Sequence, residues 1–217
     1  MKLAKYNMIE QQLRPWDVLD EYILSVVAQI NREDFVPSAY RKLAFADAQL
    51  PIGHEQVMLE PKLQARIVQD LQIKPTDTVL EIGTGTGYMT ALLARCAKHV
   101  VSVDIFADFT QKAAKNLENA GIINIELLTQ DASTATAEVL KNKYDVIVVT
   151  AALPAKAKYL EKQLTLGGRL FTIVGQKPAM AATITTKNTA NSLRDNIIFE
   201  TVIPFLLNVP TNQAFKF

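Results

Sequence analysis

Residues 79–88, with the sequence VLEIGTGTGY, constrain the fold of this chain more than any other stretch. A short apolar strand ends in three alternate glycines, Gly83, Gly85 and Gly87, and the pattern predicts a helix that begins at Tyr88. Because glycine has no Cβ, the backbone can turn sharply there and lie against a ligand. The first amides of the following helix then present a partial positive charge to that ligand. The stretch therefore predicts a nucleotide-type pocket between a strand and a helix.

The strand–helix alternation around this stretch predicts the fold class. The expected strands cover residues 78–82, 99–105, 125–129, 144–150 and 169–174, and the expected helices cover 88–98, 107–120 and 155–164, with a turn at Gly167-Gly168. Such alternation is typical of an α/β fold with a doubly wound, mostly parallel Rossmann-like sheet and helices on both faces. Two further extended runs, 181–187 and 197–203, have no helix between them. They predict an antiparallel hairpin at the C-terminal edge of the sheet.

The first 60 residues predict a helical N-terminal extension followed by a loop. Apolar residues recur at helical spacing between 18 and 30, and Asp17 is placed to cap that helix. Pro61 suits the first turn of a helix that runs to about residue 71. We therefore expect one domain over residues 1–217, with the extension and loop in 1–60 and the Rossmann-like core in 61–217. Residues 212–217 carry no assignment.

Composition excludes several classes of protein. The 217 residues are 49% hydrophobic and 21% charged, and the net charge of +1 argues against nucleic-acid binding driven by bulk charge. A single cysteine, Cys96, and two distant histidines argue against a disulfide and a metal site. No apolar run approaches the roughly 18 residues of a membrane span, and no secretory signal is recognised. We expect a cytoplasmic protein with no membrane or nucleic-acid partner; the oligomeric state is left open.

Three acidic residues narrow the choice of nucleotide. Dinucleotide-binding loops use the spacing G-x-G-x-x-G, whereas this chain has G-x-G-x-G, which disfavours an NAD-dependent oxidoreductase. Glu81, Asp104 and Asp131 fall at the carboxyl ends of consecutive strands, where open α/β sheets bind ligands. Acids there would repel a pyrophosphate but suit S-adenosylmethionine, which has a ribose, an adenine and two cationic groups. The alternative is that the three acids are ordinary turn residues at strand ends.

Several motifs resemble those of the protein-L-isoaspartate O-methyltransferases. Residues 35–37 (FVP) and 51–56 (PIGHEQ) resemble the substrate-side signature of that family, 80–88 its methyl-donor loop, and 145–152 (DVIVVTAA) its fourth-strand motif. The resemblance implies an enzyme that uses S-adenosyl-L-methionine, leaves S-adenosyl-L-homocysteine, and repairs proteins by methylating isoaspartyl carboxylates. An isoaspartyl carboxylate is ionised at pH 7, so its methylation needs no general base.

The resemblance also predicts the site residues. On the acceptor side they are His54, Gln56 and Leu59; on the methyl-donor side they are Glu81, Gly83, Thr84, Gly85, Gly87, Tyr88, Asp104, Asp131, Ala132 and Thr150.

The acceptor loop departs from the family pattern, T-I-S-x-P. This chain has Val57-Met58-Leu59-Glu60-Pro61, so Leu59 stands where the family has the serine whose hydroxyl lies beside the acceptor. Losing that hydrogen bond costs roughly 1–3 kcal/mol of interaction free energy with the acceptor if nothing replaces it. Two alternatives to isoaspartyl methylation therefore stay open: a methyltransferase with a different, more apolar acceptor, and a catalytically silent module that binds S-adenosylmethionine or a peptide.

Overall fold

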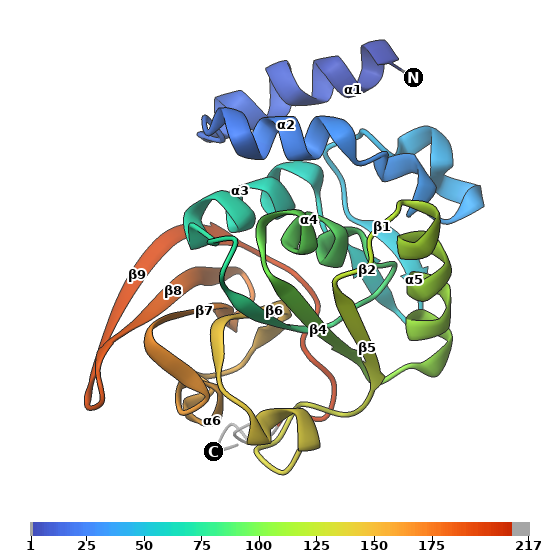
Figure 1. Ribbon diagram of the computed structural model, residues 1–217. Coiled ribbons are helices and arrows are strands. Elements are labelled where there is room, and N and C mark those ends of the chain that lie inside the picture. Colours follow the sequence, from blue (N-terminus) through green and yellow to red (C-terminus); the bar gives the residue numbers. More distant parts are fainter. Residues whose placement is uncertain (1, 210–217) are drawn as a thin grey trace, which may run out of the picture.

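A seven-stranded sheet with helices on both faces forms the centre of the computed structural model, which describes residues 2–209 (Figure 1). Its strands are β3 (Thr78–Ile82), β4 (His99–Asp104), β5 (Ile125–Thr129), β6 (Tyr144–Leu153), β7 (Leu164–Gln176), β8 (Ala179–Thr189) and β9 (Ser192–Thr201). Their order across the sheet is β5-β4-β3-β6-β7-β8-β9. The strands from β5 to β7 are parallel, and β8 and β9 are antiparallel. The predicted α/β class and the antiparallel C-terminal edge are both confirmed.

Six α-helices accompany the sheet in the described part of the chain. They are α1 (Lys2–Met8), α2 (Glu21–Gln29), α3 (Pro61–Leu71), α4 (Tyr88–Cys96), α5 (Ala107–Asn119) and α6 (Lys158–Glu161). Between α2 and α3 the chain forms a separate two-stranded hairpin, β1 (Leu50–Gly53) and β2 (Gln56–Met58), which lies near α5 (Figure 1). No helix within residues 2–209 is long and apolar enough to cross a membrane.

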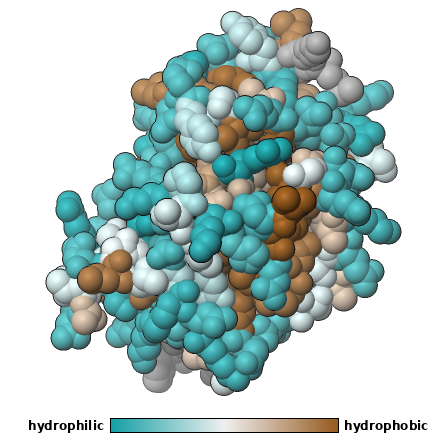
Figure 2. Space-filling view, in the orientation of Figure 1, coloured by the Kyte–Doolittle hydropathy of each residue, from teal (hydrophilic) through white to brown (hydrophobic). Residues whose placement is uncertain are grey.

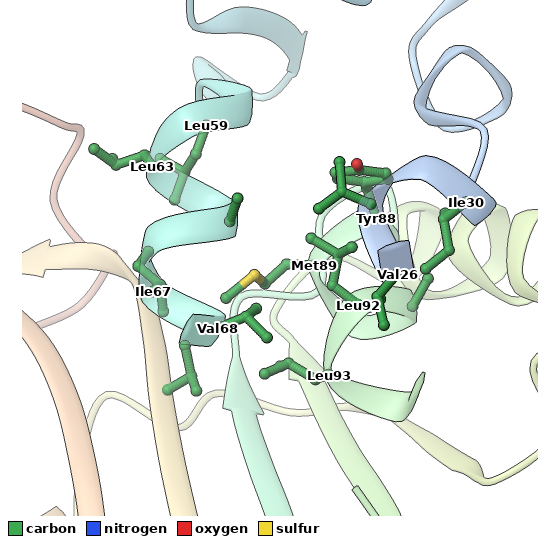
Figure 3. Packing of buried hydrophobic residues seen from close by; sticks show 14 of the residues in the cluster. Val26, Ile30, Leu59, Leu63, Ile67, Val68, Tyr88, Met89, Leu92 and Leu93 are labelled. Atoms are coloured by element: carbon green, nitrogen blue, oxygen red, sulfur yellow. The ribbon is translucent and has the colours of Figure 1, made fainter. Parts of the chain in front are cut away.

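Buried hydrophobic residues form one cluster on each side of the sheet. The central strand β6 contributes to both, since Val146 to Val149 have no exposed surface, as expected for a parallel strand covered on both faces. On one side, α2, α3 and α4 meet through Val26, Ile67 and Leu92 (Figure 3). The N-terminal helices therefore share a core with the sheet. The predicted single domain over residues 1–217 stays a prediction, because residues 1 and 210–217 lie outside the described part, as does the unassigned segment 212–217.

The outer surface is mainly hydrophilic on the face shown in Figure 2. A band of hydrophobic residues runs down the middle of this face, over the region of β4 and β5. A smaller hydrophobic area lies toward the β8–β9 hairpin. Leu193 and Ile197 of β9 are 43% and 65% exposed.

Two predicted element boundaries are wrong near the N-terminus and after β6. The cap of α2 is Asp20, whose carboxylate accepts hydrogen bonds from the amides of Tyr22 and Ile23; Asp17 lies one turn earlier in a left-handed conformation that ends a 3-10 turn. The helix expected over 155–164 shrinks to α6, because the end of that segment joins the sheet, where Leu164 pairs with Tyr144.

The predicted turn at Gly167-Gly168 is also wrong. These two glycines belong to β7, within an irregularity of its pairing with β6: Tyr144 pairs with Leu164, whereas Val146 pairs with Arg169. The extra residues of β7 bulge out of the ladder instead of separating a helix from a strand.

The topology predicts a crevice at the carboxyl ends of the central strands. The strand order reverses between β3 and β6, so that β4 and β5 lie to one side and β7 to the other. Ligands of open α/β sheets bind outside the carboxyl ends of the strands at such a reversal. The carboxyl end of β3 is the start of the glycine loop.

Candidate functional site

A cleft opens at the carboxyl ends of β3, β4 and β6 and encloses about 610 Å³, including the open space at its mouth. Its lining comes from the β1–β2 hairpin, the glycine loop, the segments at the carboxyl ends of β4 and β5, the carboxyl-terminal part of β6, and residues beyond β9. The residues predicted for the site that line it are Gln56, Gly83, Gly85, Asp104, Asp131, Ala132 and Thr150. The fold thus brings together most of the candidate site, although Gln56 and Thr150 lie 94 positions apart in sequence.

Gly83 and Thr150 form the floor of the cleft. Gly83 has a φ of 101°, and a Cβ at this position would lie 2.2 Å from Oγ1 of Thr150, so no other residue fits. The Thr150 hydroxyl uses this space to donate to the carbonyl oxygen of Gly83, at 2.7 Å. The loop is therefore tied to β6 by a side chain that also lines the cleft.

Gly87 has a different role from the one predicted. It lines neither cavity of the site and instead precedes α4 with a φ of 86°. A Cβ there would lie 3.1 Å from the Cβ of Ala113 and 3.2 Å from Leu117, both on α5. The third glycine permits close packing between α4 and α5.

Asp104 is held by the backbone at the end of β4. Its Oδ2 accepts from the amide of Gly85 at 2.8 Å, and its Oδ1 accepts from the amide of Phe106 at 3.1 Å. Burial raises the pKa of this carboxyl, and the backbone hydrogen bonds oppose that rise. Each oxygen keeps one lone pair for a further donor, which suits the two hydroxyls of a ribose.

Asp131 lies at the opposite wall, where it contacts a segment that the sequence did not assign. Its carboxylate accepts from the backbone amide of Ser133 and from Nδ2 of Asn208, each at 2.8 Å. Partial burial raises the pKa of Asp131, but these hydrogen bonds outweigh it, so the net shift is downward. The segment that carries Asn208 also brings Leu206 and Leu207 into the lining, and it is tied to β6 by the hydrogen bond from the amide of Leu206 to the carbonyl oxygen of Ala152.

Glu81 does not line the cleft, contrary to prediction. It has no exposed surface and lies below the glycine loop, where it accepts hydrogen bonds from the hydroxyls of Thr90 and Ser102 at 2.5 and 2.6 Å. Its other oxygen, Oε1, has no hydrogen-bond partner in the described structure. Burial raises the pKa of Glu81 to about 8, so the side chain is mostly neutral at pH 7.

The β1–β2 hairpin is fixed to α5 through His54. The imidazole stacks on the ring of Phe106 with a centroid distance of 3.9 Å, and its Nε2 lies 3.0 Å from Oδ2 of Asp108. The Nε2 of Gln56 donates to the carbonyl oxygen of His54, and Gln56 lines the cleft. His54 therefore positions the hairpin; it is not among the residues that line either cavity.

A second cavity of about 320 Å³, including the open space at its mouth, shares part of its lining with the first. Both are lined by Ile52, Val57, Gly83, Gly85 and Thr150. The second adds Met58, Leu59, Gln64, Thr84, Thr86, Tyr88 and Met89. It thus adds three predicted site residues, Leu59, Thr84 and Tyr88, to the three that it shares with the cleft.

Leu59 is only 3% exposed and belongs to the hydrophobic cluster, beside Leu63 at the start of α3 (Figure 3). Its carbonyl oxygen accepts a 2.6 Å hydrogen bond from Nη2 of Arg32. The departure from the family pattern therefore replaces a polar side chain by one that packs in the core.

Comparison with known proteins gives the family. The family model for protein-L-isoaspartate(D-aspartate) O-methyltransferase matches residues 4–205. The chain belongs to this family. A protein-L-isoaspartate O-methyltransferase of Koribacter versatilis is 36% identical over 206 residues, which cover 95% of this chain and 92% of the relative. One from Methanoculleus marisnigri is 41% identical over 171 residues, covering 79% and 77%.

Solved structures agree on the fold. A Plasmodium falciparum structure described as a protein-L-isoaspartate O-methyltransferase in complex with S-adenosyl-L-homocysteine superposes with a TM-score of 0.78 at 18% identity. The superposed region covers 94% of this chain and 97% of the Plasmodium falciparum chain. At this identity the likeness concerns the fold alone.

Proposed function

We propose that this protein is an S-adenosylmethionine-dependent O-methyltransferase that esterifies the carboxylate of isoaspartyl residues in proteins or peptides. Membership of the family is the observation that carries the proposal. We further infer that it acts in the cytoplasm, as its single cysteine predicts.

The shape and polarity of the site fit the methyl donor. A backbone cradle without side chains at Gly83 and Gly85 leaves room for a ligand against the loop. Asp104 offers two acceptor oxygens for ribose hydroxyls, and Asp131 with Ala132 forms the wall at which an adenine amino group would be accepted. No phosphate-binding side chain, Lys or Arg, lines the cleft in the described structure.

The chain's part in the reaction is alignment and exclusion of water. S-adenosylmethionine supplies a methyl group on a sulfonium; an acceptor oxygen forms the new C–O bond as the C–S bond breaks and its electron pair returns to sulfur, leaving a methyl ester and S-adenosylhomocysteine. An ionised acceptor carboxylate has no proton to lose, so no catalytic base is needed. Ile52 and Val57 of the hairpin place apolar side chains over the loop, which keeps water from the reacting atoms.

An assay with labelled methyl donor tests the proposal. We expect base-labile methyl ester on a peptide with an isoaspartyl residue and none on the matched aspartyl peptide. Asp104→Ala is expected to abolish the activity by removing the ribose contact. Binding of S-adenosylhomocysteine without ester on either peptide would contradict isoaspartyl methylation and favour a silent binding module. Ester on an apolar carboxylic acid but not on the isoaspartyl peptide would favour a different acceptor.

A further inference from the structure

The second cavity contains a buried amide whose orientation is fixed. Gln64, on α3, is 3% exposed, and its Oε1 accepts a hydrogen bond from Nη1 of Arg32. Since a guanidinium has donors only, the amide atom that it contacts must be the oxygen. The nitrogen Nε2 is therefore directed elsewhere. Among residues 2–209 the Nε2 atom of Gln64 has no hydrogen-bond partner, and protein atoms do not bury it completely. It is therefore accessible from the cavity that Gln64 lines.

Arg32 brings a guanidinium to this end of the site, and the carboxylate of Glu60 is the nearby opposite charge. Arg32 has no exposed surface, and its other hydrogen bonds go to neutral groups, the carbonyl oxygens of Ala44 and Leu59. Its guanidinium lies 4.8 Å from the ring centroid of Tyr88. Burial lowers the pKa of Arg32 to about 10, so it is still charged at neutral pH.

The start of α4 adds to this charge. Tyr88 and Met89 form the first turn of this nine-residue helix, and both line the cavity. The partial charge at a helix N-terminus favours an anion, as does a nearby buried guanidinium. A buried amide donor, a cation and a helix N-terminus therefore converge on one small cavity.

The relation between the two cavities indicates which anion enters. The wall formed by Asp131 lines the first cavity and not the second, whereas the loop at Gly83 and Gly85 lines both. A methyl donor with its adenosine near Asp104 and Asp131 and its sulfur over the loop extends its methionyl end toward Gln64. The group at that end that accepts hydrogen bonds is the α-carboxylate.

We propose that Nε2 of Gln64 donates a hydrogen bond to the α-carboxylate of S-adenosylmethionine, and that Arg32 is the positioning residue that orients the amide. The assignment rests on the proposed function. Val57, Met58 and Leu59 bring only apolar side chains to this cavity, so its side-chain hydrogen-bond donors are Gln64, Tyr88 and the threonines of the loop.

Titration calorimetry with two ligands tests the assignment. The ligands are S-adenosylhomocysteine and its decarboxylated form, in which hydrogen replaces the α-carboxylate. Gln64→Glu keeps an acceptor for Arg32 but turns a carboxylate oxygen, in place of the amide donors, toward the ligand. We expect the affinity for S-adenosylhomocysteine to fall about 10- to 100-fold, the range for a hydrogen bond to a charged group, and the affinity for the decarboxylated ligand to change by less than about threefold.

Two further variants complete the experiment. Gln72→Glu makes the same chemical change at the end of α3, lines neither cavity, and is expected to leave both affinities unchanged. Gln64→Met removes the amide without adding a charge and is expected to give the same selective loss, so the result does not depend on one variant. Thermal unfolding without ligand verifies that each variant is folded.

Three results would overturn the assignment. The first is an equal loss of affinity for both ligands, and the second is no loss of affinity for either. The third is an unchanged affinity for S-adenosylhomocysteine together with a raised KM for the isoaspartyl peptide. That result would place Gln64 at the acceptor instead. A wild-type protein that binds neither ligand would overturn the proposed function itself, and this assignment with it.

Discussion

Replacing Glu81 by glutamine is expected to stabilise the protein above neutral pH. The carboxyl is fully buried and receives hydrogen bonds from Thr90 and Ser102, while Oε1 has no partner in the described structure. A glutamine keeps one oxygen to accept both hydroxyl hydrogen bonds and has no charge to bury. The variant therefore has the packing of the neutral acid at every pH.

The sign and size of this effect on the unfolding free energy follow from the pKa of Glu81. Burial raises the pKa of Glu81 from 4.5 to about 8, so the folded state keeps its proton where the unfolded state has lost it. The stability that this proton confers is complete below pH 4.5 and is lost as the pH rises toward 8, at about 1.4 kcal/mol per pH unit in between. Over the whole window the loss is roughly 5 kcal/mol, an order-of-magnitude figure.

Urea unfolding of wild type and Glu81→Gln between pH 5.5 and 9 measures this. The difference in unfolding free energy should grow in favour of the variant by about 1.4 kcal/mol per unit up to pH 7.5, and level off above pH 8. Glu126→Gln makes the same chemical change at an exposed position of β5 and is the matched control with which the pH trend of Glu81→Gln is compared. A pH-independent difference for Glu81→Gln would refute the reasoning, because the group would then titrate alike in the folded and unfolded states.

Three other substitutions test the contact between α4 and α5, the ribose contact of Asp104, and the buried ion pair between Arg169 and Asp77. Gly87→Ala should lower the unfolding free energy by about 1–3 kcal/mol in urea, because its Cβ would lie 3.1 Å from Ala113 at a φ of 86°; an unchanged midpoint would contradict the tight α4–α5 contact. Asp104→Asn should weaken S-adenosylhomocysteine binding about 10- to 100-fold by calorimetry, since an amide accepts with one oxygen only; full affinity would exclude Asp104 from the ribose contact. Arg169→Leu should lower the unfolding free energy in urea by about 3–5 kcal/mol. The reason is that the carboxylate of Asp77, whose side chain is 8% exposed, loses the guanidinium 2.8 Å away. A decrease below about 1 kcal/mol would show that water replaces the guanidinium.

The sequence predicted the parallel part of the fold well because its signals are local. Strands β3 and β5 have the predicted bounds, each being an apolar run flanked by turn-forming or polar residues. The errors arose where tertiary pairing overrides a local pattern. Leu164 has helical spacing with its neighbours, yet the sheet recruits it to pair with Tyr144. Asp17 and Asp20 are both plausible caps, and only the folded chain selects Asp20.

The candidate site could be predicted in part for the same reason. The loop glycines and Asp104 are recognisable because the motif places them next to strand ends, and they line the cleft. Gln64 lies in an amphipathic helix, where a glutamine is typical of the solvent face, and only the fold shows it buried against Arg32. Asn208 lies 77 residues from Asp131, and nothing in the sequence connects the two.

The contact between Asn208 and Asp131 also determines when the site can exist during synthesis. The glycine loop and Asp104 are synthesised well before the wall made by Leu206 and Leu207, which follows the last strand of the sheet, β9. A nascent chain can complete the sheet as far as β9 and still lack that wall. A ligand held there stabilises only chains that include this segment, so the methyl donor would favour them over chains that stop at β9.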